Sequence, residues 1–154
     1  MQEIERKFLV KNLNFKQFGT PHKIMQGYIC AEEKRVVRVR HYDEKAFLTI
    51  KSASVGFSRS EFEYEIPPSD AKIMLQSLCI QPVIKKTRWI VPTAKHKWEI
   101  DVFEGENSGL IVAEIELETI GETFEIPDFI GQEVTSDIRY YNSFINQHPY
   151  STWK

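Results

Sequence analysis

The sequence has few cysteines, no glycine-rich phosphate loop and no long apolar run. Its two cysteines, Cys30 and Cys79, lie far apart and in no Cys-x-x-Cys or Cys/His cluster, so neither a disulfide scaffold nor a structural zinc site is predicted. It contains neither G-x-x-x-x-G-K-S/T nor G-x-G-x-x-G, which argues against a P-loop or a dinucleotide-binding turn. No apolar stretch reaches the roughly 18 residues that span a bilayer. We therefore expect a cytoplasmic protein without a membrane partner.

The charge balance gives no sign of a polyanionic macromolecular partner. Lysine and arginine number 20 and aspartate and glutamate 22, for a net charge of −2. Because there is no basic excess, no nucleic-acid partner is expected, and any anion site must be local. The 154 residues, 42% of them hydrophobic, fit a single globular domain over 1–154. They do not specify an oligomeric state.

Strand-like segments run through most of the chain. They are rich in Val, Ile, Phe, Tyr and Thr, alternate with period two, and are separated by short turns. We predict eight strands, at roughly 2–10, 22–31, 33–42, 45–52, 58–66, 83–91, 97–104 and 110–118. Helices are predicted near 71–80, after Pro67-Pro68-Ser69-Asp70, and at 137–147. The connections suit sequential antiparallel pairing.

Most of these strands carry charge on one face. Residues two apart in a strand point to the same side, so Glu3, Glu5 and Lys7 lie opposite Ile4 and Phe8. The other charged faces hold Arg38 and Arg40; Lys51; Arg59, Glu61, Glu63 and Glu65; Lys86 and Arg88; Glu99 and Asp101; and Glu114 and Glu116. For any single strand, a solvated outer face is the simpler interpretation.

The whole set favours a closed barrel with a charged interior. Both predicted helices need an apolar sheet face, and only the uncharged faces can supply it. We therefore predict a mostly β, α+β fold: an eight-stranded closed antiparallel β-barrel with a few flanking helices. A linear triphosphate needs several Lys and Arg donors, and Mg²⁺ or Mn²⁺ needs carboxylate oxygens. An interior that carries both suits a metal-bound triphosphate.

The segment Glu3-Ile4-Glu5-Arg6-Lys7 matches the ExExK signature of the CYTH domain proteins, the triphosphate tunnel metalloenzymes. Further motifs follow in family order: Val39-Arg40, Thr49-Ile50-Lys51, Ser58-Arg59-Ser60-Glu61, Lys86-Thr87-Arg88, Glu99-Ile100-Asp101-Val102-Phe103, Glu114-Ile115-Glu116 and Asp137-Ile138-Arg139-Tyr140. The chain thus resembles this family over nearly its whole length, and most closely its compact bacterial members. The resemblance implies an eight-stranded tunnel, open at both ends, that acts on triphosphates with a divalent metal.

The resemblance also implies a role for each site residue. Substrate phosphates would be bound by Lys7, Arg38, Arg40, Lys51, Arg59, Lys86, Arg88 and Arg139. Metal would be held by Glu3, Glu5, Glu61, Glu63, Asp101, Glu114 and Glu116. Lys86 would stabilise the leaving group, with Glu5 and Glu116 as further catalytic residues. Glu65, Glu99 and Glu118 are expected at the rim or surface.

The same tunnel can serve several activities. Hydrolysis of inorganic tripolyphosphate is favoured, because the chain is compact and shows no evident adenine pocket. The alternatives are a class IV adenylate cyclase, a thiamine or nucleoside triphosphatase, and, from another class, a non-catalytic polyphosphate-binding module. The expected partner is a small-molecule triphosphate substrate; the non-catalytic module would bind a polyanion without cleaving it.

Overall fold

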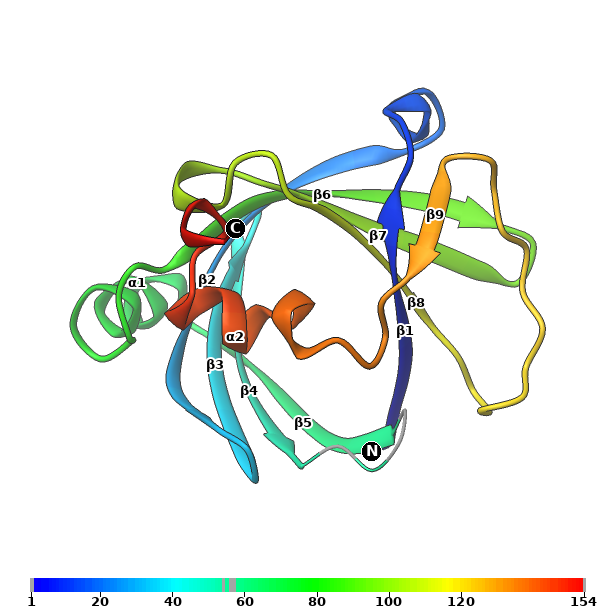
Figure 1. Ribbon diagram of the computed structural model, residues 1–154. Helices are drawn as coiled ribbons and strands as arrows, with labels where there is room; N and C mark the ends of the chain where they lie inside the picture. Colours follow the sequence, from blue (N-terminus) through cyan, green and yellow to red (C-terminus); the bar gives the residue numbers. More distant parts are fainter. Residues whose placement is uncertain (1, 54, 56–57, 154) are drawn as a thin grey trace.

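The strands form one continuous antiparallel sheet that closes on itself (Figure 1). The structure, a computed structural model, describes residues 2–53, 55 and 58–153, with only the backbone at residues 2 and 3. In these residues the strands are β1 (Gln2–Val10), β2 (Thr20–Glu32), β3 (Arg35–Tyr42), β4 (Lys45–Ser52), β5 (Ser58–Ile66), β6 (Ile84–Thr93), β7 (His96–Phe103), β8 (Ile111–Glu116) and β9 (Ile130–Glu133). Helices are α1 (Pro68–Ser77) and α2 (Asn142–Gln147), with short 3-10 helices η1 (Asn14–Gln17), η2 (Gly105–Asn107), η3 (Ile138–Tyr140) and η4 (Tyr150–Thr152).

The strand order is β5-β4-β3-β2-β6-β7-β8-β1, and β5 pairs back onto β1 to close the barrel. This confirms the predicted eight-stranded antiparallel barrel. β9 was not predicted. It pairs with the end of β1, through Phe8 opposite Glu133 and Val10 opposite Ile130, after β1 has left β5 at Ile4. A strand of four residues gives too few alternations to be recognised in the sequence.

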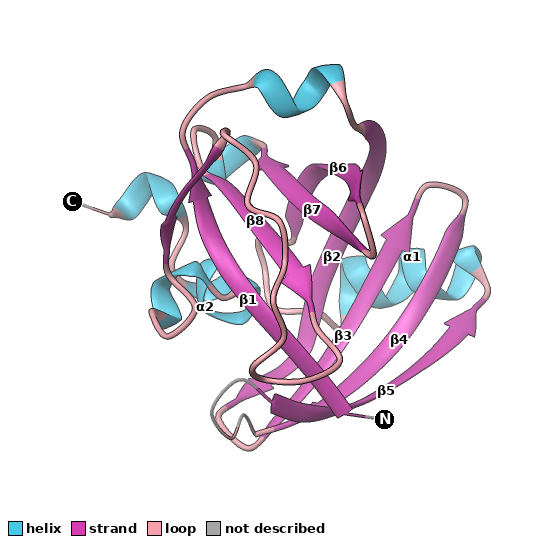
Figure 2. Cartoon of the chain, turned by 90° about the vertical axis from the view of Figure 1, so that its right-hand side faces the viewer, coloured by secondary structure: helices cyan, strands magenta, loops and turns pink. Residues whose placement is uncertain are grey.

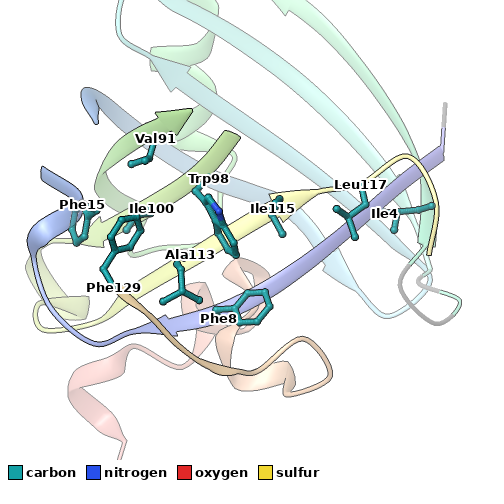
Figure 3. Close-up of a cluster of buried hydrophobic side chains, with 11 residues drawn as sticks. Ile4, Phe8, Phe15, Val91, Trp98, Ile100, Ala113, Ile115, Leu117 and Phe129 are labelled. Atoms are coloured by element: carbon teal, nitrogen blue, oxygen red, sulfur yellow. The ribbon is translucent and has the colours of Figure 1, made fainter. Parts of the chain in front are cut away.

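Much of the outer face of the barrel is apolar and covered, while Ile50 of β4 and Phe62 and Tyr64 of β5 remain exposed. One cluster joins β1, β7 and β8 to the segment before β9, with Phe8, Trp98 and Ile115 at its centre (Figure 3). Trp98 is fully buried and meets Phe8 edge to face, with ring centroids 5.3 Å apart. Such pairs add about 0.5–1.5 kcal/mol beyond the buried area. The uncharged faces of these strands are therefore packing surfaces, as expected.

Helix α1 covers the outer face of β2, β3 and β4. Ala71 and Leu75 of the helix, with Cys79 just after it, pack on Val39 and Ala46. Gly27 permits this close approach, because a Cβ there would lie 2.9 Å from the Cβ of Cys79. Both cysteines are free thiols. None of the helices in the described residues is long and apolar enough to cross a membrane.

The C-terminal segment differs from expectation. The single helix predicted at 137–147 is divided at Tyr141, which has extended backbone geometry between η3 and α2. It also packs on the inside of the barrel, where Ile145 is fully buried against Tyr28, Val36, Ile84 and other residues. In Figure 1 α2 lies across one mouth of the barrel, and Figure 2 shows it from the side. The predicted contact with the outer face is therefore wrong, because the inner faces become apolar at this end.

Candidate active site

The barrel encloses a charged cavity of about 640 Å³, to which every barrel strand contributes. Of the residues expected at a site, the cavity is lined by Glu5, Lys7, Arg38, Arg40, Lys51, Arg59, Glu61, Glu63, Lys86, Arg88, Glu114 and Glu116. Together with Lys97 and Glu99, the described lining holds eight cationic and six acidic side chains. The cavity is therefore locally cationic in a chain whose net charge is −2.

The strand register explains why these side chains converge. Directly opposite residues of an antiparallel pair project to the same face. Lys7 lies opposite Glu114, and Glu114 lies opposite Glu99. In the same way Arg88 lies opposite Asp101, and Lys51 opposite Glu61. One closed ring of strands thus brings together charges that are distant in the sequence.

Three expected site residues lie elsewhere or outside the described side chains. Arg139 is 56% exposed at its side chain, forms a bidentate pair with Asp137, and is not among the described residues that line the cavity. Asp101 is buried behind the lining, with both carboxylate oxygens engaged by cations. The Glu3 side chain lies outside the part of the chain that is described.

The deepest group joins Lys86, Arg88 and Asp101. Lys86 Nζ donates to Asp101 Oδ2 at 2.6 Å, and Arg88 binds the same carboxylate through Nε and Nη2 at 2.8 and 2.9 Å. Lys86 Nζ also donates to Asn142 Oδ1 at 3.1 Å. The pKa of Lys86 is lowered to about 7, mainly by burial; Asp101 opposes this shift and Arg88 reinforces it. Asp101 and Asn142 therefore hold in place an ammonium group that titrates near neutral pH.

A second buried group surrounds Lys7. Its Nζ lies 2.7 Å from Glu114 Oε1 and 3.3 Å from Glu5 Oε1, and 5.3 Å from the ring centroid of Tyr141. Burial alone would lower the pKa of Lys7, but Glu114 and Glu5 raise it overall. Burial likewise acts to raise the pKa of Glu114, but Lys7, Arg88 and Lys86 hold it well below its usual range. Lys7 and Glu114 are therefore a charged, buried pair.

This pair predicts a stability effect for Glu114→Gln. Glutamine keeps an acceptor for Lys7 but removes the negative charge, so the free energy of unfolding should fall by about 1.5–3 kcal/mol. The melting temperature at pH 7 should then drop by about 3–12 °C. The depressed pKa means that the wild-type advantage is complete above the ordinary glutamate pKa of about 4.3 and is lost as the pH falls toward the folded-state value.

Thermal melts of Glu114→Gln from neutral to acid pH measure this effect. Glu125→Gln, which changes an exposed glutamate, is the matched control and should melt like the wild type. Equal melting temperatures for Glu114→Gln and the wild type at pH 7 would show that the pair contributes nothing to stability.

Arg38 and Arg40 retain donors without partners. In the described part of the chain, the Nε atoms of both are buried and have no hydrogen-bond partner. Their nearest carboxylate is that of Glu63, whose Oε2 lies 3.7 Å from Arg38 Nη2 and 3.6 Å from Arg40 Nη2. Burial lowers the pKa of Arg40 to about 10, and the neighbouring Arg38 and Arg88 act in the same direction. A buried, unpaired donor is costly, so this wall of the cavity suits a bound anion.

The carboxylates suit a metal ion that is coordinated partly by the protein and partly by the phosphates of a substrate. Glu5 lies directly opposite Glu116, and Glu99 directly opposite Glu114. Like charges in such positions destabilise a sheet. Lys7 offsets part of this repulsion at Glu5 and Glu114, and Arg88 does so at Glu99; a divalent cation would offset it further. Among the described side chains, no group of three or more His, Cys, Asp or Glu residues could hold a metal ion. Mg²⁺ needs only one or two carboxylates when substrate phosphates complete its shell, so the donor set fits a metal that binds with the anion.

Some lining residues were missed in the sequence. Glu99, which was expected at the rim or surface, lines the cavity. Lys97, two residues earlier on the same face of the strand, also lines it, and extending the period-two pattern by one step would have predicted this. Tyr141, Asn142 and Ser143 also line it. The sequence carries no signal for these three, because their position depends on how the C-terminal segment folds back into the barrel.

The comparisons with known proteins agree with this geometry. The CYTH domain family model matches residues 1–144. A protein named inorganic triphosphatase from Acetivibrio thermocellus is 44% identical over 153 residues, covering 99% of this chain and 98% of the relative. One of the same name from Nitrosomonas europaea is 35% identical over 149 residues, covering 92% and 95%.

A solved structure extends the likeness to three dimensions. The crystal structure of the inorganic triphosphatase NE1496 superimposes with a TM-score of 0.67 at 30% identity, covering 93% of this chain and 96% of that one. The family signature, the closed barrel and its charged interior thus coincide in one molecule. The chain belongs to the CYTH domain family.

Proposed function

We propose that this protein hydrolyses inorganic tripolyphosphate to diphosphate and phosphate with the help of a divalent cation. The observation that carries the proposal is the pair of buried, unpartnered guanidinium donors on Arg38 and Arg40 in an enclosed cavity with a cationic excess. A dense linear polyanion satisfies such donors along its length. The two relatives that match most of the chain are both named inorganic triphosphatase, which supports the same substrate.

Binding and orientation fall to the arginines. Guanidinium groups bind phosphate oxygens in a planar fork, and Arg38, Arg40 and Arg59 all line this cavity. Lys51 adds a further cation from β4. Holding a phosphate chain in line with an attacking water is the main requirement of phosphoryl transfer.

Charge stabilisation falls to the buried lysines. Lys86 is held between Asp101 and Asn142, and Lys7 between Glu114 and Glu5. Because their positions are fixed before the substrate arrives, they need no reorganisation as negative charge builds on the leaving phosphate. Lys86 is assigned to the leaving group, since its side chain, at 1% exposure, is more buried than those of Lys7, Arg38, Arg40, Lys51 and Arg88.

Glu5 and Glu116 are the carboxylates proposed to hold the cation, with Glu61, Glu63 and Glu114 as further carboxylates in the lining of the same cavity. Glu3 belongs to the same proposed set through its place in β1. A bound Mg²⁺ or Mn²⁺ supplies Lewis-acid stabilisation of the phosphates and a more acidic water.

A phosphate-release panel tests the function. Purified protein is given tripolyphosphate, ATP or thiamine triphosphate, each with Mg²⁺ or Mn²⁺ or with a chelator. We expect metal-dependent release that is fastest, in kcat/KM, on tripolyphosphate. Faster turnover of ATP or thiamine triphosphate would reassign the substrate, and formation of cyclic AMP would indicate a cyclase. Binding without release from any compound would indicate a non-catalytic module.

Arg40→Lys should weaken substrate binding without abolishing chemistry. Lysine keeps the charge but cannot form the planar fork, so KM for tripolyphosphate should rise by about tenfold, as expected for the loss of roughly 1.4 kcal/mol of charge-assisted hydrogen bonding. Steady-state kinetics at saturating metal measure the change. Arg35→Lys is the matched control on the same strand, because Arg35 is exposed and paired with Glu32. An unchanged KM for Arg40→Lys would remove Arg40 from the binding site.

A further inference from the structure

A glutamine inside the barrel has no partner for either end of its amide. Gln26 of β2 is fully buried, and in the part of the chain that the structure describes neither its Oε1 nor its Nε2 has a hydrogen-bond partner. Buried side-chain amides are nearly always paired, because an unpaired donor or acceptor lowers stability. This exception therefore points to a role outside folding.

The strand register places Gln26 among the cations of the site. It lies directly opposite Arg40 on β3 and directly opposite Ile84 on β6. Because opposite residues of an antiparallel pair project to the same face, the Gln26 amide and the Arg40 guanidinium both point into the barrel. Lys86 lies two residues after Ile84, on the same inner face. Gln26 is thus on the strand between a phosphate-binding arginine and the lysine assigned to the leaving group.

The unpaired atoms are concentrated on this wall of the barrel. Five buried side-chain atoms of the described residues lack a partner, and four of them are Gln26 Oε1, Gln26 Nε2, Arg38 Nε and Arg40 Nε; the fifth is Asn146 Oδ1 of α2. An amide oxygen accepts a hydrogen bond and a guanidinium Nε donates one. Gln26 and the two arginines are therefore complementary, although they are not bonded to one another in this structure.

Arg40, unlike Arg38, lacks a hydrogen bond that orients its guanidinium. Arg38 lies opposite Tyr28, and its Nη2 donates to Thr49 Oγ1 at 3.3 Å. Arg40 Nη2 lies 3.6 Å from Glu63 Oε2, too far for a well-formed hydrogen bond. An acceptor at Arg40 Nε would fix the plane of the guanidinium and leave both Nη groups for a phosphate. It would also favour the charged form, which burial opposes by lowering the pKa of Arg40.

We propose that Gln26 is a positioning residue, which accepts a hydrogen bond from Arg40 Nε when a phosphate draws the guanidinium into its binding position. This role rests on the proposed function and deepens it, because it names the group that orients one phosphate-binding arginine. The amide nitrogen needs an acceptor as well, and the oxygens of the bound phosphate supply one at the same place. Gln26 therefore contributes to binding of the polyanion and lowers the stability of the free protein.

The test compares the wild type with Gln26→Met, which keeps the length of the side chain and removes both polar atoms. Loss of an unpaired buried amide should raise the melting temperature of the ligand-free protein by about 2–4 °C. KM for tripolyphosphate with Mg²⁺ should rise about tenfold, with kcat changed less than about twofold, as expected for one lost hydrogen bond to a charged group. Calorimetry with the non-hydrolysable methylene-bridged analogue of tripolyphosphate and Mg²⁺ should show a similar rise in Kd. Gln76→Met, at an exposed position of α1, is the matched control and should behave as the wild type.

A double-mutant cycle tests whether Gln26 acts through Arg40. In the background of Arg40→Met, which has no guanidinium to orient, Gln26→Met should change KM and the Kd of the analogue by less than about twofold. An equal effect of Gln26→Met in both backgrounds would show that the amide acts independently of Arg40, and would overturn the proposed role.

The remaining outcomes are equally decisive. A lower or unchanged melting temperature of Gln26→Met, or its failure to fold, would show that the amide is already satisfied in the free protein. An unchanged KM and Kd would remove Gln26 from the binding of substrate. Each of these results would also overturn the proposed role.

The wild-type measurements separate this failure from that of the proposed function. Turnover of tripolyphosphate by the wild type leaves the function standing whatever Gln26→Met does. Weaker binding of the analogue by Gln26→Met, without turnover by the wild type, would contradict hydrolysis and leave the role of Gln26 standing. A wild type that neither binds the analogue nor hydrolyses tripolyphosphate would contradict both.

Discussion

Replacing Lys86 with alanine is expected to lower kcat on tripolyphosphate by about 100- to 1,000-fold while changing KM much less. This is the usual cost of removing one preorganised group that stabilises transition-state charge. The interaction strengthens as charge develops on the leaving phosphate, so its loss appears in kcat. Asp101 keeps its two hydrogen bonds from Arg88, so the variant should remain folded. Steady-state kinetics at saturating metal measure the effect.

Lys85→Ala provides the matched control. Lys85 is the preceding residue of β6, so it projects to the opposite face, and it is exposed. Its replacement should leave kcat and KM as in the wild type. If Lys86→Ala raised KM and left kcat unchanged, Lys86 would be a binding cation and its assignment to the leaving group would be wrong.

The pH profile offers a second readout for Lys86. Burial lowers its pKa to about 7, and only the charged ammonium can stabilise the leaving phosphate. Wild-type kcat/KM, which reports the free enzyme, should therefore fall as the pH rises above about 7. The negative charge of bound phosphate raises the pKa of Lys86, so kcat should fall at a higher pH than kcat/KM does. In Lys86→Arg, whose guanidinium stays charged, this alkaline fall should disappear.

Removing a carboxylate from the proposed metal site should have the second large effect. Glu5 and Glu116 lie directly opposite each other, and Gln keeps their shape without the charge. Since even outer-shell changes cost about 10–100-fold in metal affinity, Glu5→Gln or Glu116→Gln should raise the Mg²⁺ concentration for half-maximal activity by at least that factor. Mn²⁺ binding followed by electron paramagnetic resonance, with tripolyphosphate present, gives a readout that does not depend on turnover.

Glu118→Gln is the control for these variants. Glu118 lies two residues beyond Glu116, outside the strand, and is exposed. Its replacement should leave the metal requirement unchanged. An unaltered Mg²⁺ requirement in both Glu5→Gln and Glu116→Gln would place the metal on other residues of the cavity.

Most of the barrel could be predicted from the sequence because alternation in a strand is local. The alternation within each strand is enough to identify its inner face. It predicts that Lys51, Glu61, Arg88 and Asp101 point inward, and the structure places Lys51 opposite Glu61 and Arg88 opposite Asp101. Closure followed from the number of strands and the need to cover the apolar faces. The sequence did not show where the charged cavity ends. The inner face of β6 changes from the charged Lys86 to the apolar Ile84, and the period-two alternation is the same on both sides of this change.

The C-terminal part of the site depended on tertiary contacts that no local pattern reports. The apolar residues of 137–147 fit a helix on the outer face equally well, yet Ile145 is buried inside the barrel. Arg139, grouped with the phosphate-binding residues by its motif, is instead held by Asp137 two residues away. Sequential pairing of β6 and β7 places Asp101 near Lys86 and Arg88, but the alternation of residues does not show that these two cations occupy both of its carboxylate oxygens.

The most direct test of the account is phosphorus NMR of tripolyphosphate mixed with the wild-type protein and Mg²⁺. The account predicts that the substrate signals are replaced by one diphosphate and one orthophosphate per molecule consumed, and that a chelator stops the change. Tripolyphosphate signals that persist unchanged in the presence of folded protein and Mg²⁺ would contradict it.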